Sequence, residues 1–215
     1  MASSSKPVHP PEEQVKKENS TDDFLTLFNA FIRLLERESD RGSVIVSCAL
    51  LDDALEQRLK YRLAPSPEKE DELFAGAYAP LNNFSAKIDF AYRVGVISLN
   101  TRKSLHLIRK LRNDFAHSSS EITFKTESVR HRIKELFRLT TAIFNFMGVV
   151  IKKHAELTMQ ARLAEIASHH GADYMLKLLT PRQAYEILVS ILATALQMVD
   201  NITSLTPLIT RWKNK

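Results

Sequence analysis

The segment RNDFAH, residues 112–117, brings an arginine, an asparagine and a histidine close together along the chain. An imidazole can accept a proton near neutral pH, because its unperturbed pKa is about 6.5. A guanidinium keeps its charge and binds anions through paired hydrogen bonds. Arg112 and His117 could therefore belong to one site, with Asn113 as an orienting group. The alternative is a packed helix end with an arginine that reaches out to water.

The hydrophobic pattern around this segment, LNTRKSLHLIRKLRNDFAH, predicts an amphipathic helix that is capped near Asn100. At about 100° per residue, Arg112 falls within the apolar face. A buried guanidinium without a partner is costly, so Arg112 must pair with a carboxylate, reach a rim or lie at an interface open to an anion. The apolar face carries Leu105, Ile108, Leu111 and Phe115, and the candidate carboxylates are Asp52, Asp53, Glu56 and Asp89.

The spacing within RNDFAH limits how its residues can meet. Arg112 and His117 are five residues apart, which separates them by about 140° on a helix. They converge only if the helix ends or bends, if Arg112 uses its full reach, or if a second copy of the chain supplies one partner. Asn113 and His117 are four residues apart and share a face.

Composition restricts the other kinds of chemistry. The chain has 215 residues, 44% of them hydrophobic and 26% charged, which is typical of a globular protein with a sizeable core. Five glycines leave little scope for glycine-rich phosphate loops. The only cysteine, Cys48, excludes an internal disulfide and a cysteine-cluster metal site, and its apolar surroundings predict a small buried side chain. We therefore expect no metal and no small-molecule cofactor.

Positive charge is concentrated in one part of the chain. The net charge is +5, yet residues 98–138 alone hold ten Lys and Arg against four Asp and Glu. A basic segment of this size is compatible with RNA or another anionic partner, although a solvated helix face is an equally simple explanation. The candidate anion-binding residues are Lys103, Arg109, Lys110, Arg130 and Arg132.

The distribution of helix signals predicts an all-α protein. Residues 1–20 indicate a disordered leader, because they are polar and lack periodicity. Residues 21–170 predict a helical bundle of six to eight helices, with a long central helix, or two stacked ones, from about residue 127 to residue 170. The helix signals include caps at Ser20 or Thr21 and at Asp40, a stop at Gly95, and a short last helix at residues 204–212. Residues 171–215 predict a helical extension packed on this bundle, where Thr180 caps a helix with Pro181 at its first position.

No segment is suited to cross a membrane. The longest apolar stretch, residues 184–199, contains Glu186 and Gln197 and is shorter than the roughly 20 residues that a bilayer requires. The start of the chain also lacks an apolar signal region. A cytoplasmic location without membrane contact is therefore expected.

Three stretches resemble a known family of bacterial regulators. These are LLERESDRGSVIVSCALLDDALEQRL, LFAGAYAPLNNFSAKIDFAYRVGVIS and LRNDFAH, and together they are similar to the mannitol repressor, or MltR-type, family. The hexapeptide RNDFAH also resembles the R-x4-H motif of the HEPN superfamily, in which a polar residue commonly follows the arginine. Both resemblances imply a HEPN-like antiparallel helical bundle.

The two resemblances imply different functions. The first implies a transcriptional repressor of a mannitol operon that acts through protein contacts and dimerisation and lacks a DNA-binding motif. The second implies a metal-independent endoribonuclease of the toxin or defence type, which would use Arg112, Asn113 and His117 across a homodimer. In that case the imidazole would take a proton from a 2′-hydroxyl and the guanidinium would stabilise the phosphorane. We expect a homodimer in either case, with residues 103–117 near the two-fold axis.

Overall fold

The computed structural model describes residues 12–118, 121–152 and 177–198, with side chains for 23–118, 121–143 and 177–198. All regular secondary structure in these ranges is α-helical, which confirms the predicted all-α class. The helices are α1 (Glu12–Glu36), α2 (Asp40–Arg62), α3 (Phe84–Arg93), α4 (Leu99–His117), α5 (Glu127–Lys152) and α7 (Pro181–Met198). The predicted continuation of the long helix to residue 170 and a final helix at residues 204–212 lie outside the described residues.

The helix ends follow local capping chemistry. The side chains of Ser39, Asn83 and Ser98 accept hydrogen bonds from the first turns of α2, α3 and α4, so the caps predicted at Asp40 and Asn100 are off by one and two residues. Gly95 follows α3 with a φ of 75°, in the left-handed region where glycine is favoured, which confirms it as the predicted stop.

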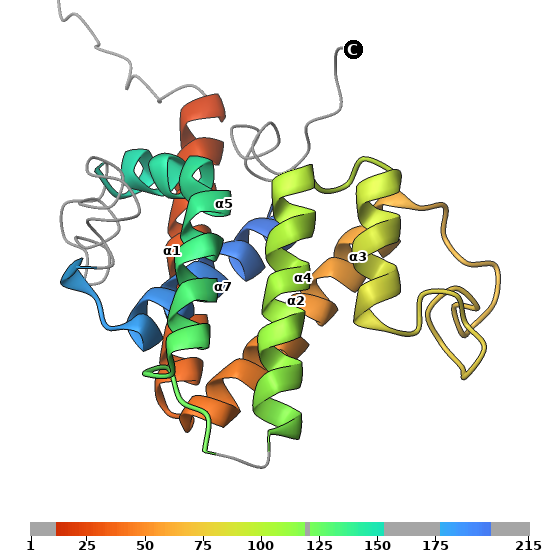
Figure 1. Ribbon diagram of the computed structural model, residues 1–215. Helices are drawn as coiled ribbons and strands as arrows, with labels where there is room; N and C mark the ends of the chain where they lie inside the picture. The colour runs from red at the N-terminus through yellow and green to blue at the C-terminus, as the bar shows by residue number, and fades with distance from the viewer. Residues whose placement is uncertain (1–11, 119–120, 153–176, 199–215) are drawn as a thin grey trace, which may run out of the picture.

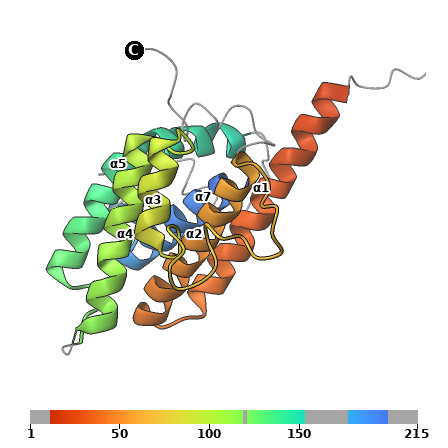
Figure 2. The same ribbon diagram turned by 90° about the vertical axis from the view of Figure 1, so that its right-hand side faces the viewer.

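The start of the first helix corrects the predicted leader. Helix α1 begins at Glu12, not after residue 20. Pro10 and Pro11 precede it, and Glu12 and Glu13 place negative charge at the helix N-terminus, where the helix dipole favours it. Figure 2 shows that the first turns of α1 extend beyond the other helices. The capping prediction at residues 20 and 21 is therefore wrong, since both residues lie inside α1.

Helix α7 lies in the centre of the bundle. It packs against α1, α2 and α5, and nearly every residue from Ala184 to Met198 is buried. In Figure 1 it crosses at a slant behind α5, while α3, α4 and α5 stand upright. The predicted extension after residue 171 thus contributes a core helix, and the central helix is α7 rather than the long helix after residue 127.

The centre of the bundle also joins segments that are far apart in the chain. The rings of Phe115 and Phe124 lie 5.6 Å apart, and those of Phe124 and Tyr185 lie 5.3 Å apart. The hydroxyl groups of Tyr185 and Ser47 are 2.5 Å apart. Aromatic packing therefore connects α4, the segment before α5, and α7, while the contact between Tyr185 and Ser47 joins α7 to α2.

Arg182 connects the first turn of α7 to the turn between α1 and α2. Its guanidinium donates to the backbone oxygens of Leu35, at 3.2 Å, and Glu38, at 2.5 Å. It also bonds Asp40, at 3.1 Å, and Glu186, at 2.8 Å. Glu186 is only 3% exposed, and burial raises the pKa of its carboxyl group in spite of the nearby guanidinium. Asp40 in turn accepts the backbone N–H of Phe124, at 3.1 Å.

No helix within the described residues is long and apolar enough to cross a membrane.

Loss of the Arg182 guanidinium should destabilise the whole bundle. We expect Arg182→Met to lower the free energy of unfolding by about 3 kcal/mol, because it leaves the buried Glu186 without its partner. The measurement is urea unfolding followed by circular dichroism at 222 nm, with Lys125→Met at an exposed position as the control. Adding Glu186→Gln to Arg182→Met should restore part of the loss. Equal midpoints for the wild type and Arg182→Met would contradict this role.

Candidate functional site

A groove of about 370 Å³ lies between α2 and α4 and ends at the start of α3. We call it the α2–α4 groove. It has an apolar side on α2 and a polar, basic side on α4. Its lining residues are Ile45, Cys48, Ala49 and Asp52 of α2, Asn83, Phe84 and Ser85 at the start of α3, and Arg109, Arg112 and Asn113 of α4.

Arg112 lies at the rim of this groove. The predicted core face of α4 is confirmed, since Leu105, Ile108, Leu111 and Phe115 are fully buried. Arg112 itself is exposed, which is the second of the three outcomes expected for its guanidinium, a position at a rim. The reason is that the opposing part of α2 does not cover this flank of α4, and Ile45 is itself 38% exposed. The Arg112 guanidinium instead donates to the Oδ1 atom of Asn113, at 3.1 Å.

Most of the carboxylates that the sequence suggested as partners of Arg112 form ion pairs with other cations. The ammonium of Lys87, a 5% exposed residue, pairs with Asp52 at 2.8 Å and with Glu56 at 2.6 Å. Burial opposes the charge of Glu56, but hydrogen bonds from Lys60 and Lys87 outweigh it and lower the pKa of this carboxyl group. Asp89 pairs with Arg102, at 2.6 Å, and His106, at 3.0 Å. Among the described residues no carboxylate pairs with Arg112, so the groove keeps an available guanidinium.

His117 lies apart from the groove. It is the last residue of α4, its side chain is exposed, and it is not among the residues that line the groove. The following carbonyl, of Ser118, accepts a hydrogen bond from Arg41 at 3.3 Å. The structure thus brings Arg112 and Asn113 together in the groove but leaves His117 at the helix end. A single chain does not assemble the arginine–histidine pair within the described residues.

The predicted anion-binding residues do not form one continuous surface. Arg109 is partly buried in the α2–α4 groove, while Lys103 and Lys110 are exposed on α4 outside it. Arg130 lines a separate cleft beside α5 and α7. Arg132 forms an ion pair with Asp114, which joins α5 to α4. This separation follows from helix geometry, because residues that are close in the sequence point to different sides of α4 and α5.

Cys48 is a buried thiol in the groove wall. Its exposed fraction is 7%, as its apolar sequence context predicts. Burial raises its pKa to about 11, and the guanidinium groups of Arg112 and Arg109 only partly oppose this. The sequence contained no signal that Asn83 joins Cys48 and Asp52 in one groove, since two segments that are far apart in the chain supply them. Within the described residues no group of three His, Cys, Asp or Glu side chains is arranged to hold a metal ion.

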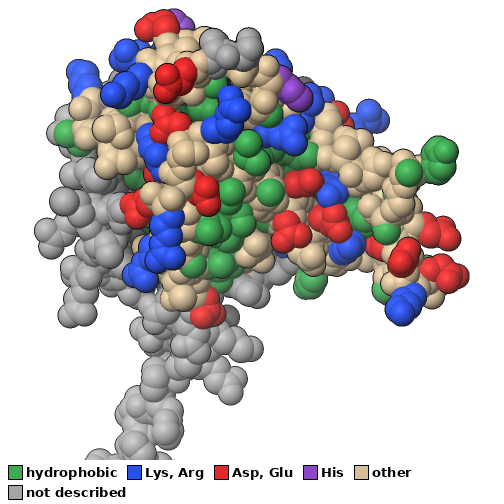
Figure 3. Space-filling view, turned by 90° about the horizontal axis from the view of Figure 1, so that it is seen from below, with side chains coloured by type: hydrophobic (Ala, Val, Ile, Leu, Met, Phe, Trp, Pro, Cys, Tyr) green, Lys and Arg blue, Asp and Glu red, His purple; other side chains and the backbone are tan. Residues whose placement is uncertain are grey.

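One end of the molecule carries apolar side chains on its surface (Figure 3). Figure 3 views the molecule from the end at which α2 begins and α4 ends, and apolar side chains gather there between acidic and basic groups. Available guanidinium groups beside apolar side chains suit a partner that carries both carboxylates and apolar groups, as a protein surface does. The arrangement can therefore bind a partner, and the His117 imidazole of the R-x4-H motif is not part of it.

No protein-family model matches the chain, and no curated protein and no solved structure matches it either. The resemblances to the mannitol repressor family and to the HEPN motif therefore stay predictions.

The thiol of Cys48 should react slowly in the native protein. With a pKa of about 11, roughly one thiol in a thousand is ionised at pH 8, against about a quarter in the unfolded chain, and the thiolate is the nucleophile. We expect Ellman's reagent to react at least about a hundredfold faster in denaturing urea than in native buffer. Native and denatured rates that agree within a factor of a few would contradict this burial.

Proposed function

We propose that the protein is a cytoplasmic regulator of the mannitol-repressor type that acts by binding protein partners, first of all a second copy of itself, through the α2–α4 groove. The observation that supports this proposal is the composition of the groove. Exposed apolar residues of α2 lie next to two arginines of α4, and the histidine of the R-x4-H motif is outside the groove. This arrangement favours binding over catalysis.

Helix α2 carries an apolar strip that the other described helices cover only in part. Ile45 and Ala49 are exposed, and Val46 and Leu50 are only partly buried. These positions recur at intervals of four residues, so they lie on one side of the helix. A soluble helix normally turns polar residues outward, and an exposed apolar strip with an arginine rim is typical of the centre of a protein interface.

The charges around this strip favour a second copy of the chain. Asp53 is exposed four residues beyond Ala49, on the same side of α2. Arg109 and Arg112 lie across the groove on α4. A two-fold interface requires a patch that complements itself, because each residue meets the partner's copy of a different residue. In such a pair the carboxylate of one chain can approach the guanidinium groups of the other while the apolar strips pack together.

A metal-independent endoribonuclease is the second candidate function. It is favoured by one contact, the hydrogen bond of 3.1 Å that holds Asn113 against Arg112. A dimer formed through α4 would then have to bring His117 to this pair from the other subunit. The regulatory proposal ranks first because it requires no such convergence.

A charge in the apolar strip should separate the dimer. We expect wild-type protein to be dimeric and Ile45→Arg to be monomeric, because two buried cations would face each other across the axis. Light scattering coupled to size-exclusion chromatography gives the mass directly. The matched control is Leu73→Arg, another exposed apolar residue, 40% exposed and outside the groove. A monomeric wild type, or a dimer that Ile45→Arg leaves intact, would refute self-association through this face.

A cleavage assay separates the two functions. We expect wild-type protein and His117→Ala to leave a labelled RNA equally intact in the presence of EDTA, since the His117 imidazole lies outside the groove. Expression in cells should also be equally harmless for both. Cleavage that disappears in His117→Ala would instead establish the endoribonuclease.

A further inference from the structure

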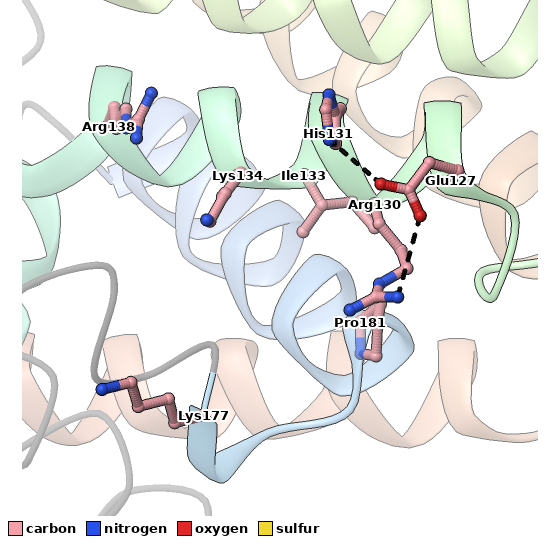
Figure 4. A pocket seen from close by; sticks show the side chains of 8 residues that line it. All are labelled: Glu127, Arg130, His131, Ile133, Lys134, Arg138, Lys177 and Pro181. Carbon is pink, nitrogen blue, oxygen red and sulfur yellow. Dashed lines mark ion pairs between the residues drawn. The ribbon is translucent and has the colours of Figure 1, made fainter.

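A second cavity, of about 540 Å³, lies between α5 and the segment that leads into α7. We call it the α5–α7 cleft. Figure 4 shows Lys134 extending from α5 toward the side on which Lys177 lies, with Arg130 pointing toward the start of α7. The lining residues are Glu127, Arg130, His131, Ile133, Lys134 and Arg138 of α5, together with Lys177 and Pro181.

The cleft has a large excess of positive charge. Of the described residues that line it, four are Lys or Arg, one is a histidine, and Glu127 is the single acid. Glu127 lies at one end, where it contacts His131 at 3.2 Å and Arg130 at 4.0 Å. Among the described residues no carboxylate pairs with Lys134, Arg138 or Lys177. By contrast, Arg102, Arg132 and Lys60 elsewhere on the surface each have an acidic partner.

A purely structural role does not account for the spacing of these cations. Arg130, Lys134 and Arg138 recur every four residues, so they form one row along α5, and like charges at this spacing destabilise a helix. Lys177 adds a further cation from the opposite side of the cleft. Solubility requires charged side chains on the surface. It does not require charged side chains from two parts of the chain to converge on one cleft. Converging cations instead concentrate a positive potential that attracts anions.

The shape of the row indicates the class of anion. From Arg130 to Arg138 the row extends about 12 Å along the helix, which is too long for a single phosphate. Among the described residues that line the cleft there is no aromatic ring on which a base could stack. The volume is that of a small-ligand pocket, which admits one strand but not a duplex. We propose that the α5–α7 cleft binds the sugar–phosphate backbone of single-stranded nucleic acid without reading its sequence.

This site is independent of the proposed self-association. The α2–α4 groove and the α5–α7 cleft have no lining residue in common and are built from different helices. Substitutions in the cleft should therefore leave the mass of the protein unchanged. Loss of nucleic-acid binding and loss of the dimer can be measured separately.

The test is fluorescence anisotropy with a labelled oligouridine of about twelve nucleotides. We expect the full-length protein to bind this oligonucleotide at ~50 mM salt, and we expect the affinity to fall toward ~200 mM salt. The slope of log K against log salt should be about −2 for three phosphate contacts. Lys134→Gln with Arg138→Gln should weaken binding at least about tenfold and reduce the slope by about 1.4. The control, Lys103→Gln with Lys110→Gln, removes the same charge outside the cleft and should change affinity less than about twofold.

Several results would overturn the proposal. These are the absence of binding by wild-type protein at low salt, equal weakening by the cleft and control variants, equally tight binding of a duplex of the same length, and equally effective competition by polyglutamate. The exposed Lys177→Gln is a second, milder variant, which should weaken binding severalfold if the double substitution perturbs folding. Circular dichroism of each variant establishes that the helices are intact.

Discussion

The burial of α7 is the constraint on which the rest of the structure depends. A helix surrounded by α1, α2 and α5 must present apolar residues on all sides and give each polar group a partner. The carboxylate of Glu186 accepts hydrogen bonds from Arg182, at 2.8 Å, and from Ser43, at 3.1 Å. The hydroxyl of Tyr185 forms a hydrogen bond with that of Ser47. Because Arg182 also binds the backbone at the end of α1, one guanidinium sets the position of three helices. The turn between α1 and α2 is thereby held against the start of the central helix.

This arrangement also explains where the molecule keeps an apolar surface. Helix α2 directs Val44, Leu51 and Leu55 into the core, and it contacts α7 and α4 from that side. The first half of α2 is apolar on its other side as well, and none of the described helices covers Ile45 or Ala49 there. Arg109 and Arg112 of α4 lie next to this strip. The α2–α4 groove thus forms because the first half of α2 is apolar on two sides, and only one of these sides packs into the core.

The two basic regions differ in their surroundings, and so in the partners that they suit. In the α2–α4 groove the arginines lie beside apolar side chains and a buried thiol, which suits a protein surface. In the described lining of the α5–α7 cleft the cations outnumber a single acid, and Ile133 and Pro181 are the apolar residues. That environment suits a chain of phosphates. The surplus charge of residues 98–138 therefore comes from separate surfaces, and the Arg132–Asp114 ion pair joins α4 to α5 within that segment.

The sequence by itself determined the features that depend on neighbouring residues. Helical periodicity predicted the all-α class and the buried face of α4, Gly95 predicted the end of α3, and Thr180 with Pro181 predicted the start of α7. Only the tertiary structure decided where α7 lies, because an apolar helix has the same pattern whether it fills a core, pairs with another chain or caps a bundle. The tertiary structure also decided that Arg112 is exposed and that Asp52 forms an ion pair with Lys87. Both outcomes depend on which sides of α2 and α4 are covered by other helices. Such long-range packing brings together residues from distant segments, and no local spacing encodes it.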